Sequence, residues 1–461
     1  MTRREAIGRG AAAAAGWIAS SGCLHRGRSD ARLAVFTAEV TVPLGHGMMG
    51  GAWLSRRVMD PLEARGFVLL GEELPVVFVS VDWCEIRNDA YARWQSVLAQ
   101  AAGTRPDRVM ISTIHQHDAP LADLGAERIL RAARLEGTVC DPVFHELAVG
   151  RVAEALRQSL TRARQVTHYG TGMARVEKVA SNRRYTLPEG SVRWDRTSAT
   201  RNAFAISADV GLIDPWLRQL SFWDGHEPLV AASFYAVHPM SYYGQGDVSA
   251  DFPGLARRQH EQERGGLPQI YVSGCSGNVT AGKYNDGSPG MRPVLADRIR
   301  AAMSEAWGKT VRQAFRGADF RVESLRLEPR QGDGFDVVDL RSKLVPGVKP
   351  FTQCLAAMGL SWRERVATGR PIEVPCLDLG GAALLVLPGE SYVEYQLAAQ
   401  RERPADFICV AGYGDGATGY VPTELHWAEH DTNLGDWCWV APGAEERMRQ
   451  AISRVLRTSR W

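Results

Sequence analysis

The sequence predicts an α/β protein in which mixed central β-sheet layers are flanked by helices (α/β/α) in one large domain. Short apolar runs alternate with longer segments whose apolar residues recur at helical spacing. No internal repeat, low-complexity tract or Pro/Ser/Gly-rich linker divides residues 31–461. With 461 residues, 45% of them hydrophobic and 23% charged, the chain is long enough to bury the large core of a globular protein.

Five segments have the composition of buried strands. Each is a short run dominated by Val, Ile, Leu, Ala or Phe, and polar, glycine or proline residues bound it. These strands are expected at residues 75–83, 108–114, 227–238, 268–275 and 382–389. Because such runs are apolar on both faces, they favour sheets that are covered on both sides.

Four segments have the apolar spacing of helices. They cover residues 88–103, 141–163, 391–403 and 443–458. Gly103 at the end of the first is a residue type that caps helices, and Pro142 falls in the first turn of the second, where no N–H is needed. Residues 310–350 carry alternating charge and are expected to form a peripheral excursion.

Charge and cysteine content exclude several classes of protein. The formal net charge is only +2, the basic residues are scattered, and no recognition module is present, so we expect no nucleic-acid partner. The eight cysteines form no CxxC pair and have no regular spacing, which argues against a thiolate zinc site or a disulfide scaffold. Membrane association is expected to be peripheral at most, through the N-terminus.

Residues 1–30 have the pattern of a twin-arginine export signal. Arg3 and Arg4 precede a short run of small apolar residues that is too short to span a bilayer comfortably. Cys23 is a candidate lipidation site, but the aliphatic residue usual three positions earlier is absent, which leaves lipidation open. We therefore expect an exported protein, periplasmic or at the cell surface. A frayed N-terminal helix is the alternative.

Histidines follow the ends of two predicted strands. In "VMISTIHQHDAP", His115 and His117 are two residues apart on an extended chain and so face the same way. His238 ends the strand at 227–238, and Pro239 stops the strand directly after it. Imidazole is a common metal ligand, although a hydrogen-bonded pair or a structural histidine would give the same pattern.

Other polar groups follow two further strands. The segment "VSGCSGNVTAGKYND" has hydroxyl and amide groups on a glycine-rich backbone that a ligand can approach closely. A simple glycine turn is the alternative interpretation. Glu390 follows a strand and Pro-Gly, where a carboxylate can act as a ligand, as a base or as part of a helix cap. The glycine-rich turn after it carries Tyr413, Asp415, Tyr420 and His426. Together these groups favour a catalytic zinc held by nitrogen and oxygen atoms.

The ordered motifs resemble the neutral/alkaline (non-lysosomal) ceramidases, in particular their N-terminal catalytic domain. "STIHQHDAP" is similar to the family's THTHSGP, and "SGCSGNVTAG" stands where the family has Gly-[Asp/Asn]-x-Ser-Pro-Asn. The other matching segments are "MMGGAWLSRRVMDPLEARGFVL", "VHPMSYYGQGDVSADFPG", "LPGE" and "GYVPT". The resemblance runs through most of residues 31–440.

This resemblance implies a zinc enzyme and assigns roles to individual residues. The implied zinc ligands are His115, His238, Glu390 and Tyr420. His117 would serve the reaction by hydrogen bonding to the transition state or by proton transfer. Thr280 corresponds to the serine of the family's loop. Arg183 corresponds to the arginine that contacts substrate, with Arg184 as the rival assignment.

The sequence also departs from the family pattern. Asp118 replaces the serine after the histidine pair and is expected to place a negative charge beside the metal, and Ala281-Gly282 replaces Pro-Asn. Insertions around a lipid-binding groove are reduced. After the tyrosine motif no room is left for the family's C-terminal immunoglobulin-like domain, so residues 31–461 are expected to be the catalytic domain alone.

The expected function is that of an exported zinc-dependent hydrolase that cleaves the amide bond of ceramide or of another lipid or small-molecule N-acyl compound. One alternative is a zinc amidohydrolase-type barrel acting on a small amide, which also opens with two histidines at a strand end. The other is a non-catalytic cell-surface binding protein on the same scaffold, which would fit the altered loop and Asp118.

Overall fold

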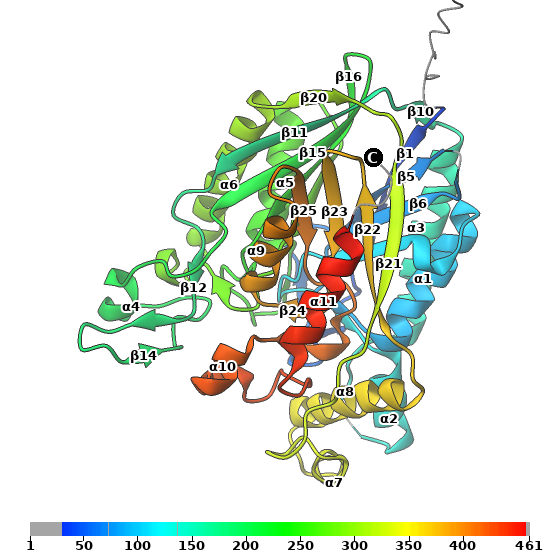
Figure 1. Cartoon of the computed structure of the whole chain (residues 1–461). Coiled ribbons are helices and arrows are strands. Elements are labelled where there is room, and N and C mark those ends of the chain that lie inside the picture. Colours follow the sequence, from blue (N-terminus) through cyan, green and yellow to red (C-terminus); the bar gives the residue numbers. More distant parts are fainter. Residues whose placement is uncertain (1–29, 72, 136, 458–461) are drawn as a thin grey trace, which may run out of the picture.

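The computed structural model describes residues 30–71, 73–135 and 137–457, and places most strands in three sheets (Figure 1). The first sheet has the strand order β10 (Arg164–Gln165), β1 (Arg32–Glu39), β5 (Glu63–Leu70), β6 (Val76–Val81), β8 (Val109–Thr113). The second has the order β18 (Gln269–Ser273), β16 (Glu227–Tyr235), β15 (Trp216–Asp224), β11 (His168–Arg175), β20 (Val311–Ala314). The third has the order β21 (Asp319–Leu325), β22 (Ile372–Asp378), β23 (Ala382–Val386), β25 (Phe407–Ala411).

The predicted α/β class is confirmed, and all five predicted strands are present as β6, β8, β16, β18 and β23. The strands are divided among several sheets, which periodicity alone does not specify. Each main sheet is open and has two edge strands. In the described part of the chain they do not close into the barrel that the amidohydrolase alternative requires, so that alternative is wrong for this chain.

Each main sheet contains one parallel pair of strands at its edge. The pairs are β6 with β8, β16 with β18, and β23 with β25, whereas the other neighbouring strands in these sheets are antiparallel. Hydrogen bonds join the carboxyl ends of the three edge strands. Thr113 N–H donates to the carbonyl of Tyr413 over 3.0 Å, and Gly412 N–H donates to the carbonyl of Ser273 over 2.8 Å. Three strand ends therefore meet at one place.

Large apolar side chains fill the space between the three sheets. Alternate residues of each strand point into this core, as the period of two requires. Its members include Phe67, Phe78, Met110, Phe222, Phe234, Ile270, Leu384 and Cys409. The residues between them in sequence, such as Val77 and Ile111, belong to a second cluster beneath the helices.

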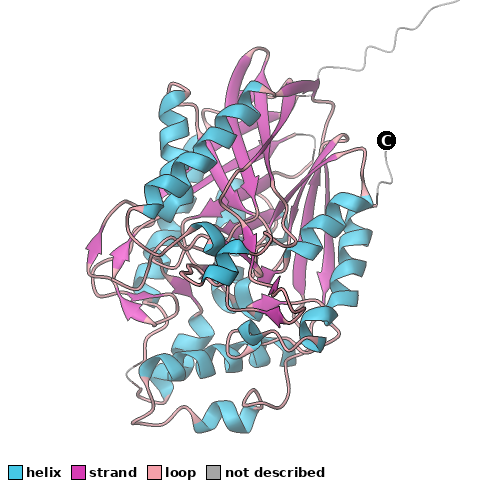
Figure 2. Cartoon of the chain, turned by 90° about the vertical axis from the view of Figure 1, so that its left-hand side faces the viewer, coloured by secondary structure: helices cyan, strands magenta, loops and turns pink. Residues whose placement is uncertain are grey.

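Helices cover the outer faces of the sheets, and Figure 2 shows the strands enclosed between them. The first sheet is covered by α1 (Asn88–Ala102) and α3 (Pro142–Leu160), the second by α5 (Asp251–Glu263) and α6 (Met291–Gly308), and the third by α9 (Val393–Glu402) and α11 (Ala444–Leu456). The four predicted helices are confirmed as α1, α3, α9 and α11. Gly103 caps α1 with a left-handed φ of 67°, and Pro142 occupies the first turn of α3.

Smaller elements connect these layers. The remaining helices are α2 (Leu124–Ala132), α4 (Ala203–Ser207), α7 (Val337–Ser342), α8 (Pro350–Ala367) and α10 (Glu424–Ala428). Short paired strands are β2 (Gly47–Met48) with β3 (Trp53–Leu54), β4 (Arg57–Val58) with β17 (Asp247–Val248), β7 (Glu85–Ile86) with β9 (Leu121–Ala122), β12 (Ser181–Asn182) with β19 (Val279–Thr280), β13 (Tyr185–Thr186) with β14 (Val192–Arg193), and β24 (Glu390–Ser391) with β26 (Tyr420–Val421). Three of these pairs, β4–β17, β12–β19 and β24–β26, position the candidate site.

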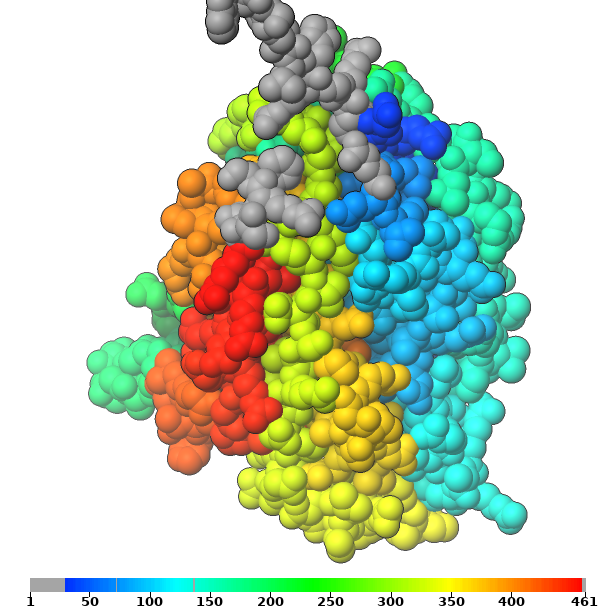
Figure 3. Space-filling view, turned by 45° about the vertical axis from the view of Figure 1, so that its right-hand side comes forward, coloured from blue at the N-terminus to red at the C-terminus, as the bar shows by residue number. Residues whose placement is uncertain are grey.

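The segment at residues 310–350 is peripheral. It supplies β20 and β21, which are edge strands of two different sheets, and the short helix α7. In the space-filling view of Figure 3 this yellow-green segment lies on the surface between the blue N-terminal part and the red C-terminal helix.

The predicted export signal and Cys23 lie outside the described residues and stay predictions. Among the described helices, none combines the length and the apolar character that a bilayer crossing requires. The seven cysteines of the described part are buried free thiols.

Replacing Phe234 by Ala tests the core between the sheets. Its ring is 3% exposed, so the substitution leaves a cavity and should cost about 3–5 kcal/mol of unfolding free energy. Phe204→Ala is the matched control, because that ring is 59% exposed and its loss should change stability by about 0.5 kcal/mol or less. Chemical denaturation followed by tryptophan fluorescence measures both. Equal effects of the two substitutions would contradict the assigned core.

Candidate metal centre

Two imidazoles and one carboxylate meet where the three sheets converge. His115 Nε2 lies 3.2 Å from Glu390 Oε2, and His238 Nε2 lies 3.8 Å from the same oxygen. All three side chains are buried. One metal-binding atom of each lies within 4.8 Å of the others, which is the spacing of ligands around a shared ion.

The backbone and one hydrogen bond fix the orientation of His115. The residue follows β8 in a left-handed conformation with a φ of 64°, which is uncommon for a residue with a side chain. Its Nδ1–H donates to the carbonyl of Cys84 over 2.8 Å, and its ring stacks on Tyr413 at a centroid distance of 4.1 Å. Since the carbonyl can only accept, Nδ1 carries a proton, and Nε2 is the ring nitrogen that faces Glu390.

His238 is held in a similar way from the second sheet. Its backbone N–H donates to the carbonyl of Val279 just after β16 ends, and Pro239 follows. Its Nδ1 lies 3.3 Å from the carbonyl of Ser276 and 3.4 Å from a guanidinium nitrogen of Arg183. Nε2 is thereby left as the ring nitrogen of His238 that faces the cluster.

Glu390 and Tyr420 are brought side by side by a parallel pair of short strands. They are register partners in β24 and β26, and Glu390 N–H donates to the carbonyl of Gly419 over 2.8 Å. The Tyr420 hydroxyl accepts a hydrogen bond of 2.8 Å from the Arg183 guanidinium. The four residues that the sequence predicts as metal ligands thus belong to one buried site.

Burial and neighbouring charges set the protonation of the site. Burial by itself lowers the pKa of His115, but the Glu390 carboxylate and Cys84 together outweigh burial and raise that pKa well above the usual value. For His117 and His238, burial and the nearby charge of His115 lower the pKa well below the usual value. Burial raises the pKa of the Tyr420 hydroxyl, whereas the charge of Arg183 favours its phenolate.

These groups fit a divalent cation that takes nitrogen and oxygen ligands. Within the described residues, His115 Nε2 and Glu390 Oε2 are buried and face each other at 3.2 Å but form no hydrogen bond, which is costly unless something else satisfies both atoms. A cation would take the place of the proton that the Glu390 carboxylate stabilises on His115 and would neutralise the buried carboxylate.

A second grouping, of Cys84, His115 and His117, is less suited to a metal. Cys84 Sγ lies 3.9 Å from His115 Nδ1, the nitrogen that already donates to a carbonyl. Burial raises the pKa of the Cys84 thiol, whereas a metal would need the thiolate. The cluster of His115, His238 and Glu390 is therefore the candidate metal centre.

His117 lies at the edge of this centre. Its Nε2 is 3.1 Å from His238 Nε2, and its ring packs edge-on against Tyr243 at a centroid distance of 4.9 Å. Its Nδ1 has no hydrogen-bond partner among the described residues. Unlike the ligand histidines, His117 is only half-buried. It is the histidine of the site that is most open to a ligand.

The two arginines that the sequence leaves as rivals point to different places. Arg183 is buried between Tyr420 and His238, with one guanidinium nitrogen 3.4 Å from His238 Nδ1. Arg184 instead forms a bidentate ion pair with Glu429, with both bonds 2.7 Å long. Only Arg183 contacts the cluster, which favours it for the predicted role.

Thr280 and Asp118 are adjacent to the centre but bond elsewhere. The Thr280 backbone bridges His238, while its hydroxyl donates to the carbonyl of Thr197 over 2.7 Å. The Asp118 carboxylate accepts from Gly244 N–H over 3.1 Å and lies 3.6 Å from Arg292. Asp118 was expected directly beside the metal ligands. Its carboxylate is instead turned toward the loop that follows His238.

Two contributors, Tyr413 and Tyr243, were given no role from the sequence. The Tyr413 hydroxyl bonds the Ser276 hydroxyl over 2.7 Å and lies 3.3 Å from His238 Nδ1, so Tyr413 touches both ligand histidines. Tyr413 has a positive φ of 56° between two glycines, and this "GYG" turn after a strand was the available signal. For Tyr243, the signal was its place five residues after His238.

Comparisons with known proteins bear on the fold. Two solved structures share it: a neutral ceramidase from Pseudomonas aeruginosa, and a ceramidase complexed with C2. Each is 18% identical to this chain and aligns with a TM-score of 0.66. Each alignment covers 94% of this chain, together with 76% of the first structure's chain and 77% of the second's. No protein-family model and no curated protein matches the sequence. The predicted resemblance to the neutral ceramidases is confirmed at the level of the fold.

Substitution of the ligands tests the metal centre. Glu390→Gln and His115→Ala each remove one donor, so the metal content should fall from about one ion per chain to well below half of that. Elemental analysis of protein purified without chelator measures it. His226→Ala is the matched control, because this exposed histidine lies in the hairpin turn between β15 and β16. An unchanged metal content in both ligand variants would contradict the assignment.

Asp118 should make stability depend on pH. Burial raises the pKa of its carboxyl to about 7 in the folded chain, so ionisation opposes folding as pH rises from the unfolded pKa of about 3.9 toward 7. Asp118→Asn cannot ionise. The unfolding free energy of the variant minus that of the native chain should therefore rise with pH, by at most about 1.4 kcal/mol per pH unit, and level off above about pH 8.

Denaturation at several pH values between 5 and 8 measures this difference. The control is Asp286→Asn, because Asp286 is exposed and hydrogen bonds to Ser288 lower the pKa of its carboxyl. Its difference from the native chain should stay constant over that range. A constant difference for Asp118→Asn would refute the expectation.

Proposed function

We propose that this chain is a zinc-dependent hydrolase of the neutral ceramidase type, which cleaves the amide bond of an N-acyl compound. The observation that carries the proposal is the buried pair of unpartnered atoms, His115 Nε2 and Glu390 Oε2, beside His238 at the meeting point of three sheets. The shared fold with two ceramidase structures supports the choice of reaction class.

Zinc is the proposed ion because of the ligand types. Two neutral imidazoles and a carboxylate are a common zinc set in hydrolases, and the Tyr420 hydroxyl supplies a fourth oxygen. The Arg183 guanidinium at 2.8 Å stabilises a phenolate at Tyr420, which a cation requires of this ligand. When bound, zinc polarises the substrate carbonyl and makes water acidic enough to attack near neutral pH.

His117 is proposed to move the proton. Burial keeps its imidazole neutral, so the ring can accept a proton from the attacking water at the edge of the cluster. The protonated His117 can then donate to the amide nitrogen as the C–N bond breaks, which lets the amine leave as a neutral molecule. Arg183 and the Ser276 carbonyl keep the ring of His238 in place beside it.

Export through the twin-arginine route remains part of the proposal. It rests on Arg3 and Arg4 and on the apolar run after them. Such export delivers a folded chain, which suits a protein that binds its metal before it leaves the cell. Periplasmic or cell-surface location follows from it.

A non-catalytic binding protein on this scaffold is the second candidate. It is favoured by the loop in which Thr280 replaces the family's serine, because the Thr280 hydroxyl is already bonded to the carbonyl of Thr197. A binding protein would keep the metal and show no turnover.

Replacing His117 by Ala separates these two functions. The variant should bind zinc as the native chain does, because His117 is not among the ligands, and should lose about 100- to 10,000-fold in kcat. Release of amine from an N-acyl substrate and zinc content are measured on the same samples, with His226→Ala as the control. Activity of the native chain should vanish on chelation and return with zinc. Full activity of the zinc-loaded His117→Ala chain would exclude the proposed role of this residue.

A further inference from the structure

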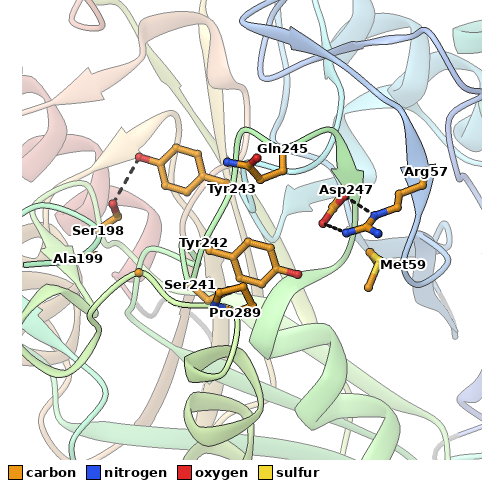
Figure 4. Close-up of a pocket in the computed structure, with 11 residues that line it drawn as sticks. Arg57, Met59, Ser198, Ala199, Ser241, Tyr242, Tyr243, Gln245, Asp247 and Pro289 are labelled. Carbon is orange, nitrogen blue, oxygen red and sulfur yellow. Dashed lines mark hydrogen bonds and ion pairs between the residues drawn. The ribbon is translucent and has the colours of Figure 1, made fainter.

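A cavity of about 620 Å³ is lined in part by Tyr243, whose ring contacts His117 (Figure 4 shows the lining residues). Its lining comes from β4, from the turn at 198–199, from the loop after His238, and from the loop before α6. We call this cavity the tyrosine pocket. Its lining residues include Arg57, Ser198, Tyr242, Tyr243, Gln245 and Asp247. Two other cavities, over α3 and around His46, have no lining residue that contacts His117.

Tyr243 joins the tyrosine pocket to the metal centre. One edge of its ring contacts His117, and the same side chain forms part of the cavity wall. Asp118 holds the loop that carries Tyr243, because it accepts from the N–H of Gly244. A substrate that reaches His117 therefore lies next to this cavity, whose volume is in the range of small-molecule sites.

The lining combines polar side chains with tyrosine rings, and its charges are balanced. Arg57 and Asp247 form a bidentate pair with bonds of 2.6 and 2.9 Å, while 66% of the Arg57 side chain stays exposed to the cavity side and solvent. The Tyr243 hydroxyl lies 3.4 Å from the hydroxyl of Ser198. Among the described residues, nothing bonds the side-chain amide of Gln245. The pocket thus offers donors and acceptors together, without a net charge of its own.

Such a lining does not suit an alkyl chain. Met59 is its one large aliphatic residue, so a buried chain would gain little from apolar contact and would cover guanidinium, carboxylate and amide groups. A charged ligand would gain little from Arg57 or Asp247, because these two side chains already pair with each other. Hydroxyl groups both donate and accept, and the tyrosine rings can pack on the C–H faces of a compact ring. An uncharged polyhydroxyl group matches this chemistry.

The position of the cavity decides which half of the substrate it receives. On the proposed function, His117 returns a proton to the departing nitrogen, so the amine half must lie on the side of His117. Tyr243 places the tyrosine pocket on that side. The acyl half then extends away from it.

We infer that the tyrosine pocket binds the amine half of the substrate, and that this half is a compact polyhydroxyl group of the kind found in an N-acylated amino sugar. This inference rests on the proposed amide hydrolysis and narrows its substrate class. Gln245, Arg57 and Asp247 determine the specificity through hydrogen bonds to the hydroxyl groups.

Three acetamides that differ only in the amine test the inference with the zinc-loaded full chain. They are N-acetylglucosamine, N-acetylhexylamine and N-acetylsphingosine. Release of the free amine is followed for each, and binding is measured separately by isothermal titration to the zinc-loaded His117→Ala chain. N-acetylglucosamine should give the highest kcat/KM and the tightest binding. Equal or better values for either alkyl amine would overturn the inference while leaving amide hydrolysis intact.

Gln245→Leu tests the pocket itself. The side chain is exposed and bonds no other described residue, so its loss should leave folding and metal content unchanged. The KM for N-acetylglucosamine should rise about 3- to 10-fold with little change in kcat, as expected for one lost hydrogen bond, and N-acetylhexylamine should not be affected. Gln262→Leu on α5 is the matched control, because it is also an exposed glutamine.

The two levels of the proposal fail in different ways. If no acetamide is hydrolysed but N-acetylglucosamine binds and Gln245→Leu weakens that binding, the pocket assignment holds and the proposed hydrolysis is wrong. If N-acetylglucosamine does not bind, or if Gln245→Leu changes nothing, the pocket assignment is wrong.

Discussion

The contact between His115 Nε2 and Glu390 Oε2, 3.2 Å long, is the interaction on which the rest of this structure depends. His115 follows a strand of the first sheet, His238 follows a strand of the second, and Glu390 follows a strand of the third. A cluster with one member from each sheet can form only if all three sheets direct a strand end to the same point. The parallel pair at the edge of each sheet achieves this, because parallel strands end at a common edge.

Two residues of this arrangement have an unfavourable backbone conformation. His115 and Tyr413 both have positive φ values, and such residues cost about 1–3 kcal/mol each unless their surroundings impose the conformation. Here the stacking of the two rings, the bond from His115 to the carbonyl of Cys84 and the bond between the Tyr413 and Ser276 hydroxyls impose it. Behind His115, Glu85 and Arg87 form an ion pair that is buried away from water. Burial raises the pKa of Glu85 to about 7. The metal centre is therefore preorganised by groups that do not touch the ion.

The sheets and the loops contribute different parts of the site. Strand ends hold the proposed ligands, whereas the loop after His238 supplies Tyr243 and the wall of the tyrosine pocket. Asp118, between these two regions, bonds the loop and not the cluster. A scaffold of this kind can retain one hydrolytic centre while its loops change the substrate, which reconciles a ceramidase-like fold with a polar pocket.

The sequence by itself determined five of the strands, four of the helices and the order of the polar motifs. The hydrophobic periods of 2 and 3.6 residues, a capping glycine and a proline in the first helical turn are local properties. They therefore indicate strands and helices whatever the arrangement of the sheets. His115 and His117 do reach one region, but His115 lies beyond the end of its strand in a left-handed conformation, so the period of an extended chain does not account for it. Only the tertiary structure decided that the strands form separate sheets, that Arg183 and not Arg184 meets Tyr420, and that Asp118 turns toward Gly244. These outcomes depend on partners more than one hundred residues apart in the chain, and no local pattern encodes them.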